Sequence, residues 1–218
     1  MSAESAMAAY YAERAQEYER IYEKPERLEQ LGELKRLVRD TFAGRRVLEP
    51  ACGTGYWTAV AAQTAARVTA FDVNESVLAL ARGKGLDPKR VKFLLEDAYE
   101  PPPFTERFDA ALVAFWWSHM PRKRVDGFLD HLHAALEPNA VVLCLDNTFV
   151  PGESTAITRT DSDGNTFQTR RLENGREFEV LKNYPTEVSL REAIGAMAVS
   201  SEVIWFCHYW ALSYRLRA

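Results

Sequence analysis

The sequence has no surplus of positive charge. Its 218 residues include 27 Lys and Arg against 31 Asp and Glu, a formal net charge of -4 at pH 7. Proteins that bind nucleic-acid backbones usually present a strong basic surface to the phosphates. We therefore expect no nucleic-acid partner.

Long apolar runs are also lacking. No stretch approaches the roughly 20 apolar residues that cross a bilayer, and the first residues, MSAESAMAAYYAERAQEYER, lack the basic and apolar parts of a secretory signal. We expect a cytoplasmic protein with no membrane contact.

Cysteine is scarce as well. Cys52, Cys144 and Cys207 are an odd number at wide spacing, each within an apolar stretch. This pattern is typical of reduced, buried thiols and argues against a disulfide framework or a zinc site. Internal repeats and linker-like segments are absent too, so we expect one domain, 1–218.

Short apolar runs alternate with helical patterns through the middle of the chain. Such alternation is typical of a doubly wound α/β fold with a mainly parallel sheet. The expected strands are 47–50, 68–72, 91–95, 108–115 and 141–145, and the expected helices are 57–66, 76–83 and 122–136.

The flanking segments have different patterns. Two amphipathic helices, 3–22 and 25–42, are expected to form an N-terminal cap, 1–43, before the core, 44–147. Asn174-Gly175 between two extended segments predicts a β-hairpin within 148–185, which we expect to be added to the sheet. The remainder, 186–218, is expected to supply a helix from about 189 to 197 and two closing strands.

The segment RVLEPACGTGYWT, residues 46–58, carries the strongest chemical signal. A strand runs through Gly53 and Gly55 into a helix, and glycines there let the backbone turn sharply and approach a ligand. Asp72 ends the next expected strand, where a carboxylate can accept the hydrogen bonds of a ribose diol. Thr58 replaces the small residue usual in dinucleotide folds. The pattern predicts an adenosine-type ligand other than a dinucleotide.

Four segments together resemble one enzyme family. VLEPACGTG is similar to motif I of the class I S-adenosylmethionine (SAM)-dependent methyltransferases, and FDVNESVLALAR, EDAYEPPPF and FDAALVAFWWSHMP are similar to the segments that follow it. YYAERAQEYERIY resembles the helix with which small-molecule members cap the cofactor. The resemblance implies a Rossmann-like fold with an antiparallel closing strand, SAM as cofactor and S-adenosylhomocysteine as product.

The resemblance also implies roles for individual residues. Glu49 would orient the loop, Gly53 and Gly55 would admit the methionine part, Asp72 would hold the ribose, and Asp97 with Ala98 would hold adenine. The further cofactor-binding residues that it implies are Tyr11, Arg14, Ala51, Trp57, Val73 and Phe115. The implied reaction is methyl transfer to an oxygen or nitrogen of a small-molecule acceptor.

Candidate acceptor-site residues follow the fourth strand. His119 is the best candidate for a general base, since imidazole at an ordinary pKa takes a proton from a hydroxyl or amine; a packing role is the alternative. Tyr10, Trp116 and Trp117 can wall the acceptor, although aromatic residues also serve core packing. Arg170 can clamp a carboxylate or phosphate, unless it faces solvent.

We expect no metal. Asp146 and Asn147 end the fifth strand, but the fourth strand ends in Ala114, Phe115 and Trp116, which offer no side-chain oxygen to complete a cation site. The alternatives left open are a nicotinamide-dependent oxidoreductase, a non-catalytic SAM-binding module and a methyltransferase acting on protein. The sequence allows a monomer or a homodimer.

Overall fold

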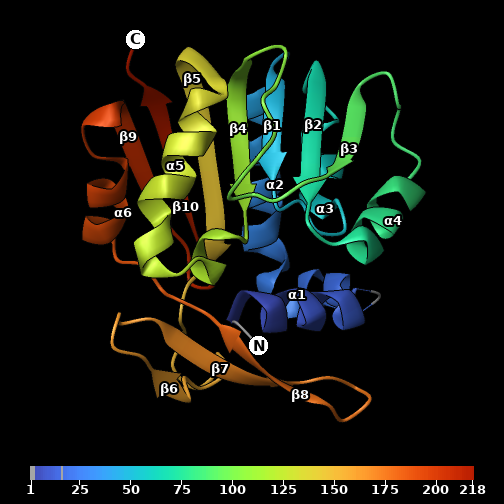
Figure 1. Ribbon diagram of the computed structural model, residues 1–218, viewed down its shortest axis with the longest axis vertical. Coiled ribbons are helices and arrows are strands. Elements are labelled where there is room, and N and C mark those ends of the chain that lie inside the picture. The colour runs from blue at the N-terminus through green and yellow to red at the C-terminus, as the bar shows by residue number, and fades with distance from the viewer. Residues whose placement is uncertain (1–2, 16) are drawn as a thin grey trace.

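The computed structural model describes residues 3–15 and 17–218. Its core is a seven-stranded sheet in the order β3-β2-β1-β4-β5-β10-β9 (Figure 1). The strands are β1 (Arg46–Pro50), β2 (Arg67–Asp72), β3 (Val91–Leu95), β4 (Phe108–Ala114), β5 (Leu136–Asn147), β9 (Ala198–Trp205) and β10 (Tyr209–Leu216).

The sheet is mainly parallel, as the alternating pattern predicted. β1 pairs with β2 and β4 in parallel, β2 with β3, and β4 with β5. β10 lies between β5 and β9 and is antiparallel to both. The predicted Rossmann-like fold with an antiparallel closing strand is confirmed.

Helices cover both faces of this sheet. One apolar cluster joins the sheet to α2 and α3, and a second joins it to α5 and α6. Both clusters include fully buried strand residues, because strands buried on both faces bring apolar side chains to each layer. The helices of the core are α2 (Leu28–Phe42), α3 (Tyr56–Ala61), α4 (Glu75–Gly83), α5 (Val125–Ala134) and α6 (Glu187–Ile194).

A second, smaller sheet lies beyond the end of the main sheet at which the parallel strands finish (Figure 1). It contains β6 (Arg159–Thr160), β7 (Thr166–Arg171) and β8 (Glu177–Leu181), paired antiparallel. The helix α1 (Ala3–Arg14) lies between the two sheets (Figure 1). The predicted hairpin exists, but it was wrong to expect it on the main sheet, because its apolar residues Leu172 and Val180 are buried in a cluster with Tyr10 of α1.

Several element boundaries differ from the prediction. The expected helix 3–22 stops at Arg14 and is followed by a 3-10 helix, η1 (Tyr18–Tyr22); Gln16 lies outside the described residues. Another 3-10 helix, η2 (Pro25–Arg27), precedes α2. The helix expected at 122–136 consists of η4 (Arg122–Arg124) and α5, and the next strand already begins at Leu136.

The early start of β5 has a local cause. Phe108 pairs with Leu136, whereas the next pair joins Ala110 to Val141, so the register shifts. Asn139 has a φ of 65° within the inserted residues, a conformation that Asn tolerates better than most residues. The helical periodicity of the sequence therefore continues to Leu136, although Leu136 is already the first residue of an irregular strand.

Two further expectations concern membranes and thiols. Among residues 3–15 and 17–218, the structure contains no helix that combines the length and apolarity of a membrane span. All three cysteines are free thiols; Cys144 is buried and Cys52 is partly buried, but Cys207 is exposed, contrary to the expectation. Cys207 lies in the turn between β9 and β10, where its side chain faces solvent.

Candidate active site

The turn between β1 and α3 brings three left-handed residues, at alternate positions, to the carboxyl edge of the sheet. Ala51, Gly53 and Gly55 have φ values of 52°, 55° and 72°. An added Cβ at Gly55 would lie 2.9 Å from the Cβ of Ala81, so glycine is required there by both conformation and space. Ala51 adopts the same region with a Cβ, which costs about 1–2 kcal/mol.

Asp72 closes this turn from the end of β2. One carboxylate oxygen accepts a hydrogen bond from the backbone N–H of Gly53 at 2.9 Å, and the other accepts from the backbone N–H of Asn74 at 2.9 Å. Burial raises the pKa of Asp72 above its usual value, although these backbone donors and that of Val73 oppose the shift. The carboxylate is therefore fixed by two loops and faces a cavity.

That cavity has a volume of about 300 Å³ and follows the ends of β1, β2, β3 and β4. It is closed on the side of α1 and η1 by Tyr11, Tyr18 and Tyr22. The predicted cofactor-binding residues in its lining are Tyr11, Glu49, Ala51, Gly53, Trp57, Asp72, Val73, Asp97, Ala98 and Phe115. Among them, Asp97 holds its own loop by accepting a hydrogen bond from the backbone N–H of Tyr99 at 2.8 Å.

Two polar groups on this cavity are buried without a partner among the described residues. Both carboxylate oxygens of Glu49 and the indole Nε1 of Trp116 make no hydrogen bond there. Burial raises the pKa of Glu49 to about 8, since a low-dielectric site disfavours the ionised carboxylate, and an interaction with the Thr58 side chain opposes this shift only in part. Buried polar atoms left without partners are costly, and ones that line a cavity are available to a ligand.

Aromatic rings form the wall on the α3 side. Tyr22 stacks on Tyr56 with ring centroids 3.9 Å apart, and Trp57 stacks on Phe115 with centroids 5.7 Å apart. The indole N–H of Trp57 donates to the hydroxyl of Tyr22 at 3.1 Å. These contacts fix η1 against α3 and make this wall largely apolar.

His119 lies at the far end of the cavity, in the 3-10 helix η3 (Trp117–His119). Its Nδ1 is 2.8 Å from the carbonyl oxygen of Leu181, and its Nε2 is 2.7 Å from the hydroxyl of Tyr11. Because a carbonyl only accepts, Nδ1 carries the proton and Nε2 accepts from Tyr11. Burial lowers the pKa of His119 to about 3, and the nearby charge of Lys182 adds to this effect.

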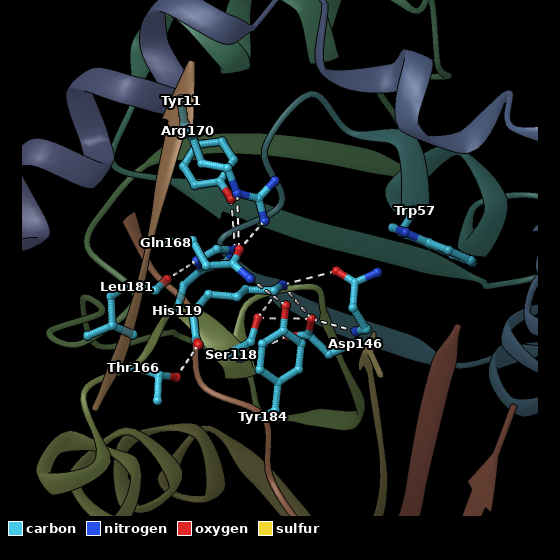
Figure 2. Close-up of polar contacts among 12 residues, drawn as sticks. Tyr11, Trp57, Ser118, His119, Asp146, Thr166, Gln168, Arg170, Leu181 and Tyr184 are labelled. Carbon is cyan, nitrogen blue, oxygen red and sulfur yellow. Dashed lines mark hydrogen bonds and ion pairs between the residues drawn. The ribbon is translucent and has the colours of Figure 1, made fainter. Parts of the chain in front are cut away.

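A buried polar cluster holds η3 in place (Figure 2). Asp146 accepts hydrogen bonds from the backbone N–H and the hydroxyl of Ser118, both at 2.9 Å. Lys182 donates to the Ser118 hydroxyl at 2.6 Å and to Asp146 at 3.1 Å. Burial alone would raise the pKa of Asp146, but the Lys182 ammonium and the N–H donors lower it below its usual value.

A second cavity, of about 180 Å³, lies on the other side of His119, between η1 and the small sheet. It shares Tyr11, Tyr18, Phe115 and His119 with the first cavity. Its remaining lining residues come from separate parts of the chain and are largely polar: Arg14, Ile21, Lys24, Arg27, Asn147, Thr148, Glu153, Ser154, Thr155, Arg170, Lys182 and Tyr184.

Comparison with known proteins places this geometry in a family. Residues 47–139 match the family model described as a methyltransferase domain. Two solved complexes of DhpI, one with S-adenosylhomocysteine and one with SAM and HEP, are 29% and 28% identical to the chain with TM-scores of 0.78 and 0.79. They cover 98% and 97% of this chain, and 96% of each DhpI chain is matched. Residues 47–139 are thus a methyltransferase domain, and the chain has the fold of the class I SAM-dependent methyltransferases.

One curated relative adds a partial match. The chain is 35% identical over 105 residues to a demethylmenaquinone methyltransferase of Clavibacter sepedonicus. The match covers 47% of this chain and 41% of the relative, so the chain spans less than half of that protein's length. It is a likeness of the SAM-binding segment and leaves the acceptor open.

The structure places five predicted residues outside the lining of the first cavity. Arg14 and Arg170 line the second cavity instead. Tyr10 is buried with Met7, Leu172 and Val180, and Trp117 is buried with its ring against Trp210. Tyr10 and Trp117 therefore serve packing, whereas Trp116 does line the first cavity. Gly55 acts indirectly, because its left-handed conformation permits the β1–α3 turn.

The fold brings residues into both cavities from distant segments that no sequence motif marks. Tyr18 and Tyr22 lie within the amphipathic pattern of 3–22, and Lys182 and Tyr184 follow β8 without any motif. The sequence feature that could have indicated Lys182 is its position as an isolated lysine after an apolar strand. Among residues 3–15 and 17–218, no group of three or more His, Cys, Asp or Glu side chains is placed to hold a metal ion.

Proposed function

We propose that the protein transfers the methyl group of SAM to an oxygen or nitrogen of a small molecule. The observation that carries this proposal is the pair of cavities that meet at His119, the first beside the β1–α3 turn and the second under the small sheet. A donor site and an acceptor site that share one wall allow reactants to be aligned, and alignment supplies much of the rate enhancement in such transfers.

The first cavity fits SAM through groups that the protein leaves available. Asp72 would accept from the ribose hydroxyls, with Val73 beside it, and Asp97 with Ala98 would hold adenine. Ala51 and Gly53 would let the methionine part approach the backbone. SAM supplies a positively charged sulfonium that makes its methyl group electrophilic.

Glu49 would meet the positive charge of the cofactor. Its carboxylate lines the first cavity, and its raised pKa means that burial favours the protonated form. A cation bound nearby favours the carboxylate. Binding of the cofactor would therefore compensate the buried Glu49 carboxylate instead of adding an unpaired buried charge.

The second cavity supports a small acceptor. Its volume of about 180 Å³ is below the roughly 300–1,000 Å³ of drug-sized ligand sites. Tyr11 and His119 lie at the junction of the cavities, where the acceptor atom and the methyl group would meet. We assign them to orienting the acceptor, since the low pKa of His119 makes it a weak base near pH 7.

Calorimetric titration with S-adenosylhomocysteine tests the donor site. We expect micromolar binding to the unmodified protein and a loss of about tenfold to a hundredfold in Asp72→Asn, because a charged acceptor of two hydrogen bonds becomes a neutral one. Asp130→Asn, an exposed substitution on α5, serves as the matched control. Equal affinity in both variants would remove Asp72 from the site, and no binding to the unmodified protein would overturn the proposed function.

A further inference from the structure

We infer that the second cavity binds a small oxyanion, and that the methyl acceptor is an oxygen of a carboxylate, phosphonate or phosphate group. This inference rests on the proposed function and specifies the substrate class for the same site. It depends on the charges that line the second cavity, on the partners those charges have, and on the position of the cavity beside the donor site.

The lining of the second cavity is strongly basic, although the whole chain is acidic. It contains the five cationic side chains of Arg14, Lys24, Arg27, Arg170 and Lys182, and Glu153 is its acidic side chain. Glu153 is already engaged, with a carboxylate oxygen 2.8 Å from the Nε2 of His208. Clustered positive charges repel each other and are expensive to hold together unless an anion compensates them.

Arg14 and Arg170 are held by uncharged partners. Arg170 donates from Nε and Nη2 to the amide oxygen of Gln168, at 3.1 and 2.5 Å, and Arg14 donates from Nη1 to the hydroxyl of Tyr10 at 2.7 Å. Among residues 3–15 and 17–218, neither guanidinium has a carboxylate within ion-pair distance. Their orientation is thus fixed while their charge remains uncompensated.

Gln168 is itself fully buried and firmly placed. Its amide nitrogen donates to the backbone carbonyl of Thr155 at 2.5 Å and to the hydroxyl of Tyr184 at 3.0 Å. Figure 2 shows Arg170 beside Tyr11, directly above Gln168 and His119. The small sheet therefore presents a pre-oriented guanidinium at the junction of the two cavities.

Two more donors in the lining are buried without a hydrogen bond among the described residues. They are the hydroxyl of Thr148 and Nε of Arg27, although the Arg27 guanidinium forms a long ion pair with Glu26 at 4.0 Å and interacts with the Tyr209 hydroxyl. Lys182, in contrast, is paired with Asp146 and contributes little net charge. Guanidinium groups bind carboxylate and phosphate oxygens in paired hydrogen bonds, so the available donors match an oxyanion better than an amine.

The chemistry of an oxyanion also fits the junction. An oxygen lone pair forms the new O–CH3 bond while the S–CH3 bond breaks and its electron pair returns to sulfur. The negative charge of oxygen and the positive charge of sulfur cancel, the products are a methyl ester and S-adenosylhomocysteine, and a fully ionised acceptor releases no proton. No general base is required, which agrees with a His119 that stays neutral and accepts a hydrogen bond from Tyr11.

Binding of simple anions tests the inference. With the protein saturated by S-adenosylhomocysteine, we would titrate methylphosphonate, inorganic phosphate, acetate and propylamine up to about 10 mM, where a millimolar Kd still gives a signal. We expect at least one anion to bind and propylamine not to bind. Preference for methylphosphonate and phosphate over acetate identifies a tetrahedral acceptor group, and the reverse identifies a carboxylate.

Arg170→Gln and Arg171→Gln form a matched pair on β7, because Arg171 is the exposed neighbour outside the cavity lining. We expect anion affinity to fall at least about tenfold in Arg170→Gln and to stay within about twofold in Arg171→Gln. Affinity for S-adenosylhomocysteine should be unchanged in both. A tenfold loss of that affinity in Arg170→Gln would show that Arg170 serves the cofactor and would overturn its role in acceptor binding.

The two proposals fail in different ways. If S-adenosylhomocysteine binds and none of the three anions does, the inference is wrong and the proposed function stands; if S-adenosylhomocysteine does not bind, the proposed function itself fails. A turnover assay with a pH indicator gives a second test. At about pH 9, where phosphate and phosphonate groups are fully ionised, methyl transfer to a bound anion should release no proton, whereas transfer accompanied by about one proton per turnover would point to a hydroxyl or amine and overturn the inference.

Discussion

His119 shows how one residue's surroundings decide its chemistry. At an ordinary pKa, a histidine at this position would suit a general base. In the fold its side chain is 5% exposed, its Nδ1–H donates a hydrogen bond to the Leu181 carbonyl, and its Nε2 accepts one from the Tyr11 hydroxyl. A neutral imidazole that already accepts a hydrogen bond is better suited to orienting than to removing a proton.

The pH dependence of the reaction tests this role. Because burial lowers the pKa of His119 to about 3, the imidazole stays neutral from pH 5.5 to 8 and kcat should show no His119 limb in that range. His119→Gln should lower kcat about tenfold, the loss of roughly one hydrogen bond, with the same pH profile as the unmodified protein. A limb near pH 6.5 that disappears in His119→Gln would restore the general-base role.

The predictable site residues are those that share a local pattern. Glu49, Gly53, Gly55 and Asp72 belong to one strand, turn and strand unit, whose geometry follows from backbone rules that sequence reveals. Lys182 reaches Ser118 and Asp146 from 64 and 36 residues away. No periodicity or motif encodes such contacts, so the polar cluster and the basic cavity appear only once the chain is folded.

The β1–α3 turn is the element that sets the donor site, and its glycines differ in what they require. An alanine at Gly53 would meet no atom within 4 Å and carries only the cost of its φ of 55°. At Gly55 the new Cβ would also lie 2.9 Å from Ala81 and 3.3 Å from Phe93, which ties α3 to α4 and β3.

We therefore expect Gly55→Ala to be the more harmful of the two substitutions. Strain at positive φ costs about 1–2 kcal/mol at either position, and overpacking adds about 1–3 kcal/mol at Gly55. Thermal unfolding measurements should show a clearly lower Tm for Gly55→Ala than for Gly53→Ala. Equal Tm values would mean that α4 moves away freely and that the turn tolerates a side chain.

The secondary-structure elements, like the site residues, divide into features that a local sequence pattern predicts and features that depend on tertiary packing. Helix and strand periods placed most core elements within a few residues, because each period reflects a face buried against the sheet. The Asn174-Gly175 turn predicted the hairpin, but the partner of that hairpin depends on Leu172 and Val180 meeting Tyr10 of α1. Sequence pattern reports that a face is apolar, and only packing decides which element covers it.

At the scale of the whole molecule, two buried groups give opposing pH effects on stability. The pKa of His119 falls to about 3, so its unfolded form binds the extra proton and stability rises from pH 3 until about 6.5. The pKa of Glu49 rises to about 8, so its folded form binds the extra proton, and stability falls from about pH 4.5 up to 8. Between pH 6.5 and 8 only the Glu49 effect continues.

Glu49→Gln isolates that effect, because the amide resembles the protonated carboxyl and cannot ionise. In denaturant unfolding without ligand, the unmodified protein should lose on the order of 1–2 kcal/mol of unfolding free energy between pH 6.5 and 8, and Glu49→Gln should lose little. Glu100→Gln, which alters an exposed carboxyl, should keep the full fall. If unfolding free energy has the same dependence on pH in all three proteins, Glu49 ionises freely in the folded state. The first cavity would then be too polar for burial of Glu49 to favour a cation there.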